Sequence, residues 1–289
     1  MTGSGLSLWV ALGTALAAVL LASMVLILPW LRLRRIRLQI EGRYLEAVAD
    51  FHAQKAPPTA ARVIAQISGE SARRLLRGMT VDRQPAGPAC WPARGWLRYD
   101  QDQRERPVVA DTFSIPGVWW AQIRRVRLRY LGWIDEMHEV EEGSVSSGYW
   151  WLGVWRIHHP AARSSELALR AQALGEAVLT PWVWFAGQGI EWEDLDDGRT
   201  RVGRIRPGGL GIRLQLDNLD RPIHLELRDD ARGERVRLEY EGWNWSDTGL
   251  RPRRMRLIEA PGTVNAFTRL ELQLGIVQWA PAAAGPPSR

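Results

Sequence analysis

The feature that most constrains this chain is an uncharged run of 26 residues, from Leu6 to Leu31. A helix of this length measures about 39 Å at about 1.5 Å per residue, so it can cross the roughly 30 Å hydrocarbon core of a bilayer with some tilt. Trp9 and Trp30 lie near its two ends, where tryptophan rings favour the headgroup region. The run therefore predicts a transmembrane anchor over residues 1–31.

A cleaved signal peptide is the main alternative, and it needs a basic N-terminal region and a shorter apolar stretch. Residues 1–8 contain no Lys or Arg, so we expect the helix to be retained. Four arginines follow the run and none precedes it: Arg32, Arg34, Arg35 and Arg37. We expect these side chains to meet anionic lipid at the membrane surface. The positive-inside rule then predicts a single-pass protein of the bacterial cell membrane, with its C-terminal domain in the cytoplasm.

Charge and cysteine content exclude several function classes. Most of the formal net charge of +6 lies in residues 32–43, so the rest of the chain is nearly neutral. A nucleic-acid partner would need a basic face on the domain itself, and we expect none. Cys90 is the only cysteine, which excludes an intramolecular disulfide and cysteine-based zinc sites.

The first part of the remaining chain reads as helical. Residues 32–57 predict a basic juxtamembrane helix that ends at the Pro57-Pro58 pair, because proline disfavours helix at and before its own position. A second helix is predicted from Thr59 to Gly78, followed by a Pro- and Gly-rich loop over residues 84–92.

Beyond this loop the period changes to that of strands. Eleven or twelve short strands are predicted, joined by turns such as Asp197-Gly198 that are too short for parallel crossovers. One helix, Ser164–Leu179, interrupts them. The predicted fold class is α+β: after the transmembrane helix, a mainly antiparallel curved sheet forms a half-barrel over residues 58–279, with two or three helices. Residues 280–289 read as a disordered tail.

Several stretches resemble a known family in this order: RGWLRYD, FSIPGVWWAQIR, ELALRAQALGEAVLTPWVWF, IEWEDLDDGRTRV and GWNWSDTGLRPRRMRLIE. The chain resembles an uncharacterised bacterial family of membrane-anchored, β-rich proteins over about residues 70–278, most specifically at EAVLTPW. It departs at residues 120–122, where the family often has an acidic residue. The resemblance implies a fold similar to the lipoprotein-carrier half-barrels, which shield lipid chains under a curved sheet. It implies no catalytic residue.

A search for chemistry finds no recognised motif. His158 and His159 are adjacent, so on a strand they would point to opposite faces. The stretch from His138 to Glu142 lacks the spacing of a helical zinc motif and is interpreted as a solvated strand end. The acidic run 191–198 is interpreted as a strand entering a hairpin turn. No metal, cofactor or catalytic residue is predicted, and an enzyme ranks third among the possible functions.

The 16 tryptophans are the one unusual constellation. If Trp182 and Trp184 lie on one strand, they share a face, and so do Trp243 and Trp245. The interpretations that stay open are an aromatic core that fills a curved sheet, a cavity for a lipid or similar ligand, and a surface that dips into the bilayer. The candidate ligand-binding residues are Trp119, Trp150, Trp182, Trp184 and Trp243.

The sequence therefore supports two hypotheses. The first is a membrane-anchored protein that binds a lipid or another hydrophobic ligand under its curved sheet. The alternative is a non-enzymatic interaction or scaffold subunit of a membrane complex, whose partner is a membrane protein and whose concave face is filled by protein.

Overall fold

The computed structural model combines helices with one large antiparallel sheet, so the fold class is α+β, as predicted. It describes residues 3–54, 57–67, 70–81, 84–129, 132–141, 144–157, 166–185, 190–194, 199–205, 209–246 and 249–279.

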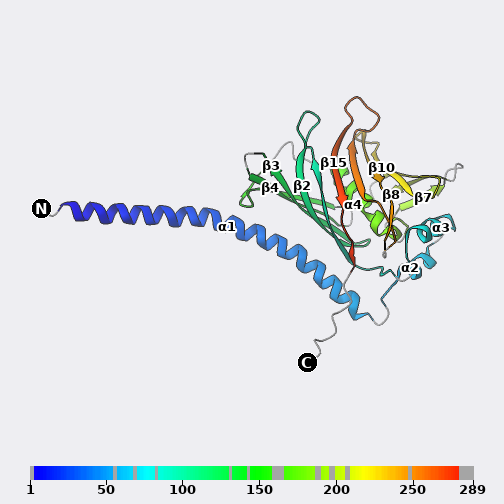
Figure 1. Ribbon diagram of the computed structural model, residues 1–289, viewed down its shortest axis with the longest axis horizontal. Coiled ribbons are helices and arrows are strands. Elements are labelled where there is room, and N and C mark those ends of the chain that lie inside the picture. Colours follow the sequence, from blue (N-terminus) through cyan, green and yellow to red (C-terminus); the bar gives the residue numbers. More distant parts are fainter. Residues whose placement is uncertain are drawn as a thin grey trace.

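Helix α1 (Gly3–Ala53) is a single continuous helix of 51 residues. Its first half projects away from the sheet, as Figure 1 shows. The helix ends shortly before the Pro57-Pro58 pair. Among the residues that the structure describes, no helix has a stretch both long and apolar enough to span a membrane. The transmembrane anchor stays a prediction.

The second half of α1 packs against the sheet. One face of the helix is buried over Leu33, Ile40, Tyr44, Val48 and Phe51. The spacings of seven, four, four and three residues keep these side chains on one helical stripe. They contact residues of three neighbouring strands, β3, β4 and β5: Trp119, Ala121, Ile123, Met137 and Trp150.

Two short helices replace the single helix that the sequence predicts over residues 59–78. These are α2 (Ala60–Gln66) and α3 (Glu70–Met79). The backbone of Ile67 is extended, with ψ of 130°, and this ends α2. The continuous-helix prediction is therefore wrong at this point, although the two helices together cover nearly the predicted range and end one residue beyond it.

The sheet consists of two groups of strands. The first group is β1 (Ala89–Leu97), β2 (Arg106–Ile115), β3 (Trp119–Leu128), β4 (Gly132–Glu141), β5 (Ser144–Trp151) and β6 (Trp155–Arg156). The second group is β7 (Ile190–Asp194), β8 (Thr200–Ile205), β9 (Leu210–Leu216), β10 (Pro222–Asp229), β11 (Glu234–Glu241), β14 (Arg254–Glu259), β15 (Phe267–Leu274) and β16 (Gln278–Trp279). A separate hairpin joins β12 (Asn244–Ser246) to β13 (Gly249–Arg251). The predicted loop 84–92 is partly wrong, because β1 already begins at Ala89.

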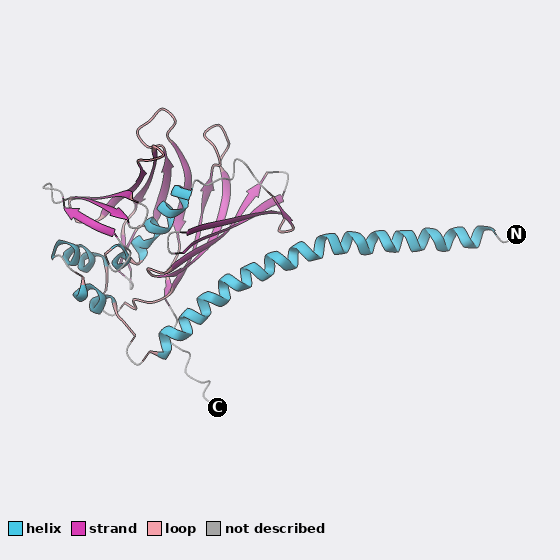
Figure 2. Cartoon of the chain, turned by 180° about the vertical axis from the view of Figure 1, so that it is seen from behind, coloured by secondary structure: helices cyan, strands magenta, loops and turns pink. Residues whose placement is uncertain are grey.

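The described strands form two meanders that meet in the middle of one sheet. Its order is β6-β5-β4-β3-β2-β1-β15-β14-β11-β10-β9-β8-β7, and β16 also pairs with β1. The seam is the antiparallel pair β1–β15, from Ala93 opposite Leu274 to Leu97 opposite Leu270. The sheet curves strongly, which Figure 2 shows from behind.

Helix α4 (Glu166–Glu176) carries the chain from one meander to the other. It contacts strands of both, β4 and β5 on one side and β10, β11 and β14 on the other, and thus lies across the concave face. Two short 3₁₀ helices follow, η2 (Ala177–Leu179) and η3 (Pro181–Trp184). Together with α2 and α3 these elements cover the large apolar core on the concave face.

Candidate functional site

The five tryptophans named from the sequence do not gather in one place. Trp119 and Trp150 are buried in the cluster beneath α1, on the outer face of the sheet. Trp182 and Trp184 are buried in the core on the concave face, and Trp243 packs half-buried against that core. The curved sheet separates the two groups.

The predicted strand positions of these residues are wrong in two places. Trp182 and Trp184 lie in η3, because Pro181 begins a helical turn rather than a strand. Trp184 donates its indole N–H to the carbonyl oxygen of Leu174 at 2.7 Å. Trp243 follows the end of β11, and Trp245 lies in the small hairpin with 63% of its surface exposed, so these two do not form a pair in the core.

The arginines that follow the apolar run are exposed on α1. These are Arg32, Arg34, Arg35 and Arg37. The guanidinium of Arg34 lies over the ring of Trp30 at 5.3 Å. Arg37 pairs with Glu41 at 2.8 Å and approaches Asp111 of β2 at 3.8 Å. Arg37 therefore also ties the helix to the sheet.

A cluster of buried polar side chains lies between α4 and strands β2 to β4, and the sequence did not predict it. We call it the polar cluster. Its members are Tyr99, Thr112, Gln122, Arg124, Glu136, His138, Gln172 and Glu176, each at most 5% exposed. Strand register brings it together: Gln122 lies opposite Thr112 on one side and His138 on the other, and Arg124 lies opposite Glu136.

One half of the polar cluster centres on Glu176 of α4. Its carboxyl group accepts hydrogen bonds from the amides of Gln122 at 3.0 Å and Gln172 at 2.6 Å, and from the indole of Trp120 at 3.3 Å. Burial nevertheless raises the pKa of Glu176, because desolvation disfavours the carboxylate more than these donors stabilise it. Arg124 bridges to the other half by donating to Gln122 and Gln172.

The other half centres on Glu136 of β4. Its carboxylate accepts from the hydroxyl of Tyr99 at 2.5 Å, contacts His138 Nε2 at 3.2 Å and pairs with Arg124 at 3.5 Å. Burial alone would raise the pKa of Glu136, but these three partners lower it. Burial lowers the pKa of His138 to about 4, so its ring is neutral near pH 7. The ring's Nδ1 lies 3.0 Å from the hydroxyl of Ser147 on β5.

The interpretation of His138 as part of a solvated strand end is therefore wrong. Its side chain is fully buried, because β4 lies inside the sheet and His138 points toward the concave face. His158 and His159 lie outside the described residues. Within the described part of the chain, no three His, Cys, Asp or Glu side chains gather closely enough to hold a metal ion.

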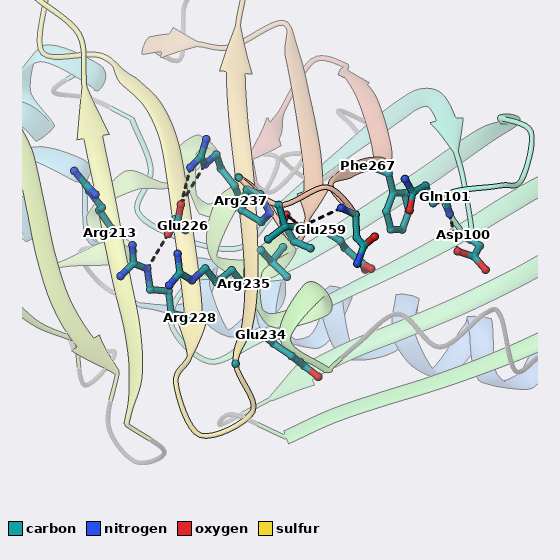
Figure 3. A pocket seen from close by; sticks show the side chains of 17 residues that line it. Asp100, Gln101, Arg213, Glu226, Arg228, Glu234, Arg235, Arg237, Glu259 and Phe267 are labelled. Carbon is teal, nitrogen blue, oxygen red and sulfur yellow. Dashed lines mark hydrogen bonds and ion pairs between the residues drawn. The ribbon is translucent and has the colours of Figure 1, made fainter.

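A hollow of about 890 Å³ opens on the outer face of the second meander. Figure 3 shows arginines of β9 to β11 in this hollow, with Glu226 between Arg228 and Arg237. Glu226 pairs with Arg228 at 2.8 Å and with Arg237 at 2.9 Å. The pair with Arg237 crosses from β10 to β11, as ion pairs on a solvated sheet face do, whereas Arg228 lies two residues along β10. No tryptophan contributes to its lining.

Comparison with known proteins identifies no family model and no curated protein that matches the chain. Three solved structures are similar in architecture, as the sequence resemblance implied. A domain described as an outer membrane lipoprotein-sorting protein from Vibrio parahaemolyticus aligns with a TM-score of 0.46 and 13% identity, over 72% of this chain and 90% of its own. A LolA superfamily protein from Nitrosomonas europaea aligns with a TM-score of 0.43 and 12% identity, over 73% and 94%. A DUF1329 family protein from Desulfovibrio piger aligns with a TM-score of 0.44 and 11% identity, over 75% and 92%. These scores are too low to carry a function across, so the proposals below rest on the residues of this chain.

Proposed function

We propose that this protein is membrane-anchored and binds the apolar chain of a lipid or similar ligand between its curved sheet and the helices on the concave face. The observation that carries the proposal is that most of the helices covering the concave face are short. The core on the concave face is large and apolar, yet it is closed by α2, α3, η2 and η3, of 7, 10, 3 and 4 residues. Helices this short are not stable without tertiary packing. An apolar chain can therefore compete with them for the same surface.

The tryptophans fit this role on one side of the sheet only. Trp182 and Trp184 belong to the cover and core on the concave face, with Trp243 beside them. Trp119 and Trp150 instead hold α1 against the outer face. We therefore restrict the proposed ligand contacts to the first three.

The anchor is the other part of the proposal. Residues 1–31 would cross the bacterial cell membrane, and the arginines of residues 32–37 would lie at its cytoplasmic surface. Because α1 continues unbroken into its packed half, it would hold the sheet at a set angle to the bilayer. A C-terminal reporter that is active only outside the cytoplasm would overturn this orientation.

A specific observation favours a second candidate function, an interaction subunit of a membrane complex. Helix α4 is buried along most of its length, at residues 167, 168, 169, 171, 172, 175 and 176. The carboxyl groups of the polar cluster are hydrogen-bonded within the protein. A concave face filled in this way would leave the outer surface for a partner protein.

Photo-crosslinking of the full chain with a diazirine-bearing fatty acid in native membranes separates the two candidates. Ligand binding predicts crosslinked peptides from residues 177–184 and from the core strands β9 to β11. Crosslinks confined to residues 6–31 would show contact with bulk lipid alone and would overturn the proposal. The variant Trp184→Phe, which keeps an aromatic ring in the core, provides a matched chain in which the interior crosslinks should shift but the anchor crosslinks should not.

A further inference from the structure

Ser147 is an exposed residue whose hydroxyl group contacts the first of two buried side chains. It lies directly opposite His138 on neighbouring strands, β5 and β4. Its oxygen is 3.0 Å from His138 Nδ1, and His138 Nε2 is 3.2 Å from Glu136. Ser147 itself is exposed, whereas His138 is 0% and Glu136 1% exposed. The three groups thus run from the surface into the protein.

The hydrogen-bond partners fix the direction of each bond. An ionised carboxylate only accepts, and Glu136 already accepts from Tyr99. His138 Nε2 must therefore carry the proton and donate it to Glu136, since a neutral imidazole has one N–H. Nδ1 is then the acceptor, and the hydroxyl of Ser147 donates to it. Nδ1 therefore has a free lone pair that can take the proton of the serine hydroxyl. Nε2 has this role in a Ser-His-Asp triad, where the acid holds the N–H of Nδ1 instead.

The backbone N–H of Ser147 is a hydrogen-bond donor on the side of β5 that faces away from β4. Ile157 N–H donates to the carbonyl oxygen of Tyr149 at 3.0 Å, so the polar backbone groups of Tyr149 point away from β4. In a strand these groups alternate sides with a period of two. The N–H of Ser147, two residues earlier, therefore also points away from β4, toward the edge of the sheet. A serine nucleophile's own N–H is one of the donors that stabilise an oxyanion in acyl transfer.

We propose that Ser147 is an acyl-transfer nucleophile, with His138 as its general base and Glu136 as the positioning residue. Ser147 Oγ forms a bond to the carbonyl carbon of an ester while its proton passes to His138 Nδ1. The carbon–oxygen bond to the leaving alcohol then breaks, and the alcohol takes that proton. Water, deprotonated by His138, releases the acid and restores the serine. This activity goes beyond lipid binding and does not depend on it.

The surroundings indicate an ester with an apolar acyl chain. Tyr149 and Trp151 follow Ser147 on the same face of β5 at a spacing of two residues, and the ring of Tyr149 meets His138 edge-on at 5.7 Å. The ring centroids of Trp151 and Trp155 lie 5.3 Å apart with the ring planes tilted by 33°, and Trp155 is 38% exposed. We call Trp151 and Trp155 the aromatic strip; Trp151 lies about 13 Å along β5 from Ser147, at about 3.3 Å per residue. An acyl chain of medium length would reach from the hydroxyl to the strip.

Labelling with a fluorophosphonate tests the nucleophile directly in the detergent-solubilised full chain. We expect a covalent adduct on the peptide that contains Ser147, and its loss in Ser147→Ala. Ser146→Ala is the matched control, because Ser146 is an exposed neighbour opposite Glu139 on the other face of β5 and should label normally. Absence of an adduct at Ser147 in the natural chain would overturn the proposal.

Hydrolysis of p-nitrophenyl octanoate provides the second readout. Ser147→Ala and His138→Gln should each lower the rate at least about a hundredfold, the usual contribution of a positioned base, while Ser146→Ala leaves it unchanged. Thermal melting shows whether His138→Gln still folds, and Ser147→Ala decides the outcome in either case. A rate in Ser147→Ala within twofold of the natural chain would refute the assignment. The fatty-acid crosslinking pattern of Ser147→Ala should stay unchanged, so failure here and failure of lipid binding are distinguishable.

Discussion

Arg124 and Arg125 are neighbours on β3 whose replacement by methionine should have very different effects. Arg124 is 2% exposed and faces Glu136 in the polar cluster, whereas the side chain of Arg125 is 58% exposed and pairs with Asp135 on the outer face. Removing one partner of a buried ion pair costs about 3–5 kcal/mol, because the other charge stays buried. The pair of Arg125 with Asp135 is exposed on the arginine side only, since Asp135 is 6% exposed. Asp135 would still accept a hydrogen bond from the indole N–H of Trp133 at 3.0 Å, so losing the solvated guanidinium of Arg125 should cost about 1 kcal/mol. For a domain of this size, 1 kcal/mol corresponds to about 2–4 °C in melting temperature. We therefore expect Arg124→Met to lower the melting temperature by about 6–20 °C, and Arg125→Met by about 4 °C at most.

The assay is thermal unfolding of the full-length variants in the same detergent, followed by circular dichroism. The charge of Arg124 helps to lower the pKa of Glu136, so its removal raises that pKa. Glu136 then binds a proton at a higher pH, and the destabilisation by Arg124→Met should shrink as the solution becomes more acidic. The double variant Arg124→Met/Glu136→Gln should lose less than the sum of the two single changes. Equal losses from Arg124→Met and Arg125→Met at neutral pH would refute the assignment of Arg124 to a buried charged cluster.

Three further predictions test other parts of the structure. Gly95→Ala would place its Cβ 1.7 Å from a carbonyl oxygen of β15, so it should destabilise the protein by about 3 kcal/mol or more. Gly42→Ala has open space around it in α1 and should stabilise the protein by about 0.5–1 kcal/mol. Denaturant titration of both variants measures these changes in the free energy of unfolding. Ile40→Ala should cost about 2–5 kcal/mol and raise hydrogen exchange along α1, whereas Leu38→Ala, at a side chain 55% exposed, should leave exchange unchanged. The pKa of His138 falls from 6.5 to about 4 on folding, so the unfolded chain binds a proton at a higher pH than the folded chain does. The melting temperature should therefore fall as the pH drops from 6.5 to about 4. An equally steep fall of the melting temperature with pH in His138→Gln would contradict this.

The fold could largely be predicted from the sequence because its strands follow simple local patterns. The stretch 234–241 alternates apolar and charged residues, and its burial alternates in the same way. Short turns between such strands leave only antiparallel pairing. The break between α2 and α3 is harder to predict, because the apolar positions 63–76 keep a helical period across it.

The polar cluster could not be predicted, because the burial of its residues on β3 depends on helix α4, which is distant in the sequence. Arg124 and Arg125 look alike in the sequence, and alternation only says that they face opposite sides. Helix α4 covers one side with Gln172 and Glu176, about 50 residues further along the chain. Helix α1 covers other parts of the opposite face, so β3 is buried on both sides over much of its length. The two-residue period therefore carries little information about exposure here.

The seam between β1 and β15 has a consequence for how the chain reaches its native state. The strand at the centre of the sheet, β15, comes after all but one of the other described strands in the chain, yet it joins the two meanders. During synthesis on the ribosome, the strands of the first meander can pair with one another as they emerge. The free edge of β1 stays unpaired until β15 has been made, about 170 residues later. An unpaired edge is where strands of other molecules add. Nascent chains stalled before residue 267 should therefore bind chaperones or aggregate, and release of the full-length chain should be the step that closes the sheet.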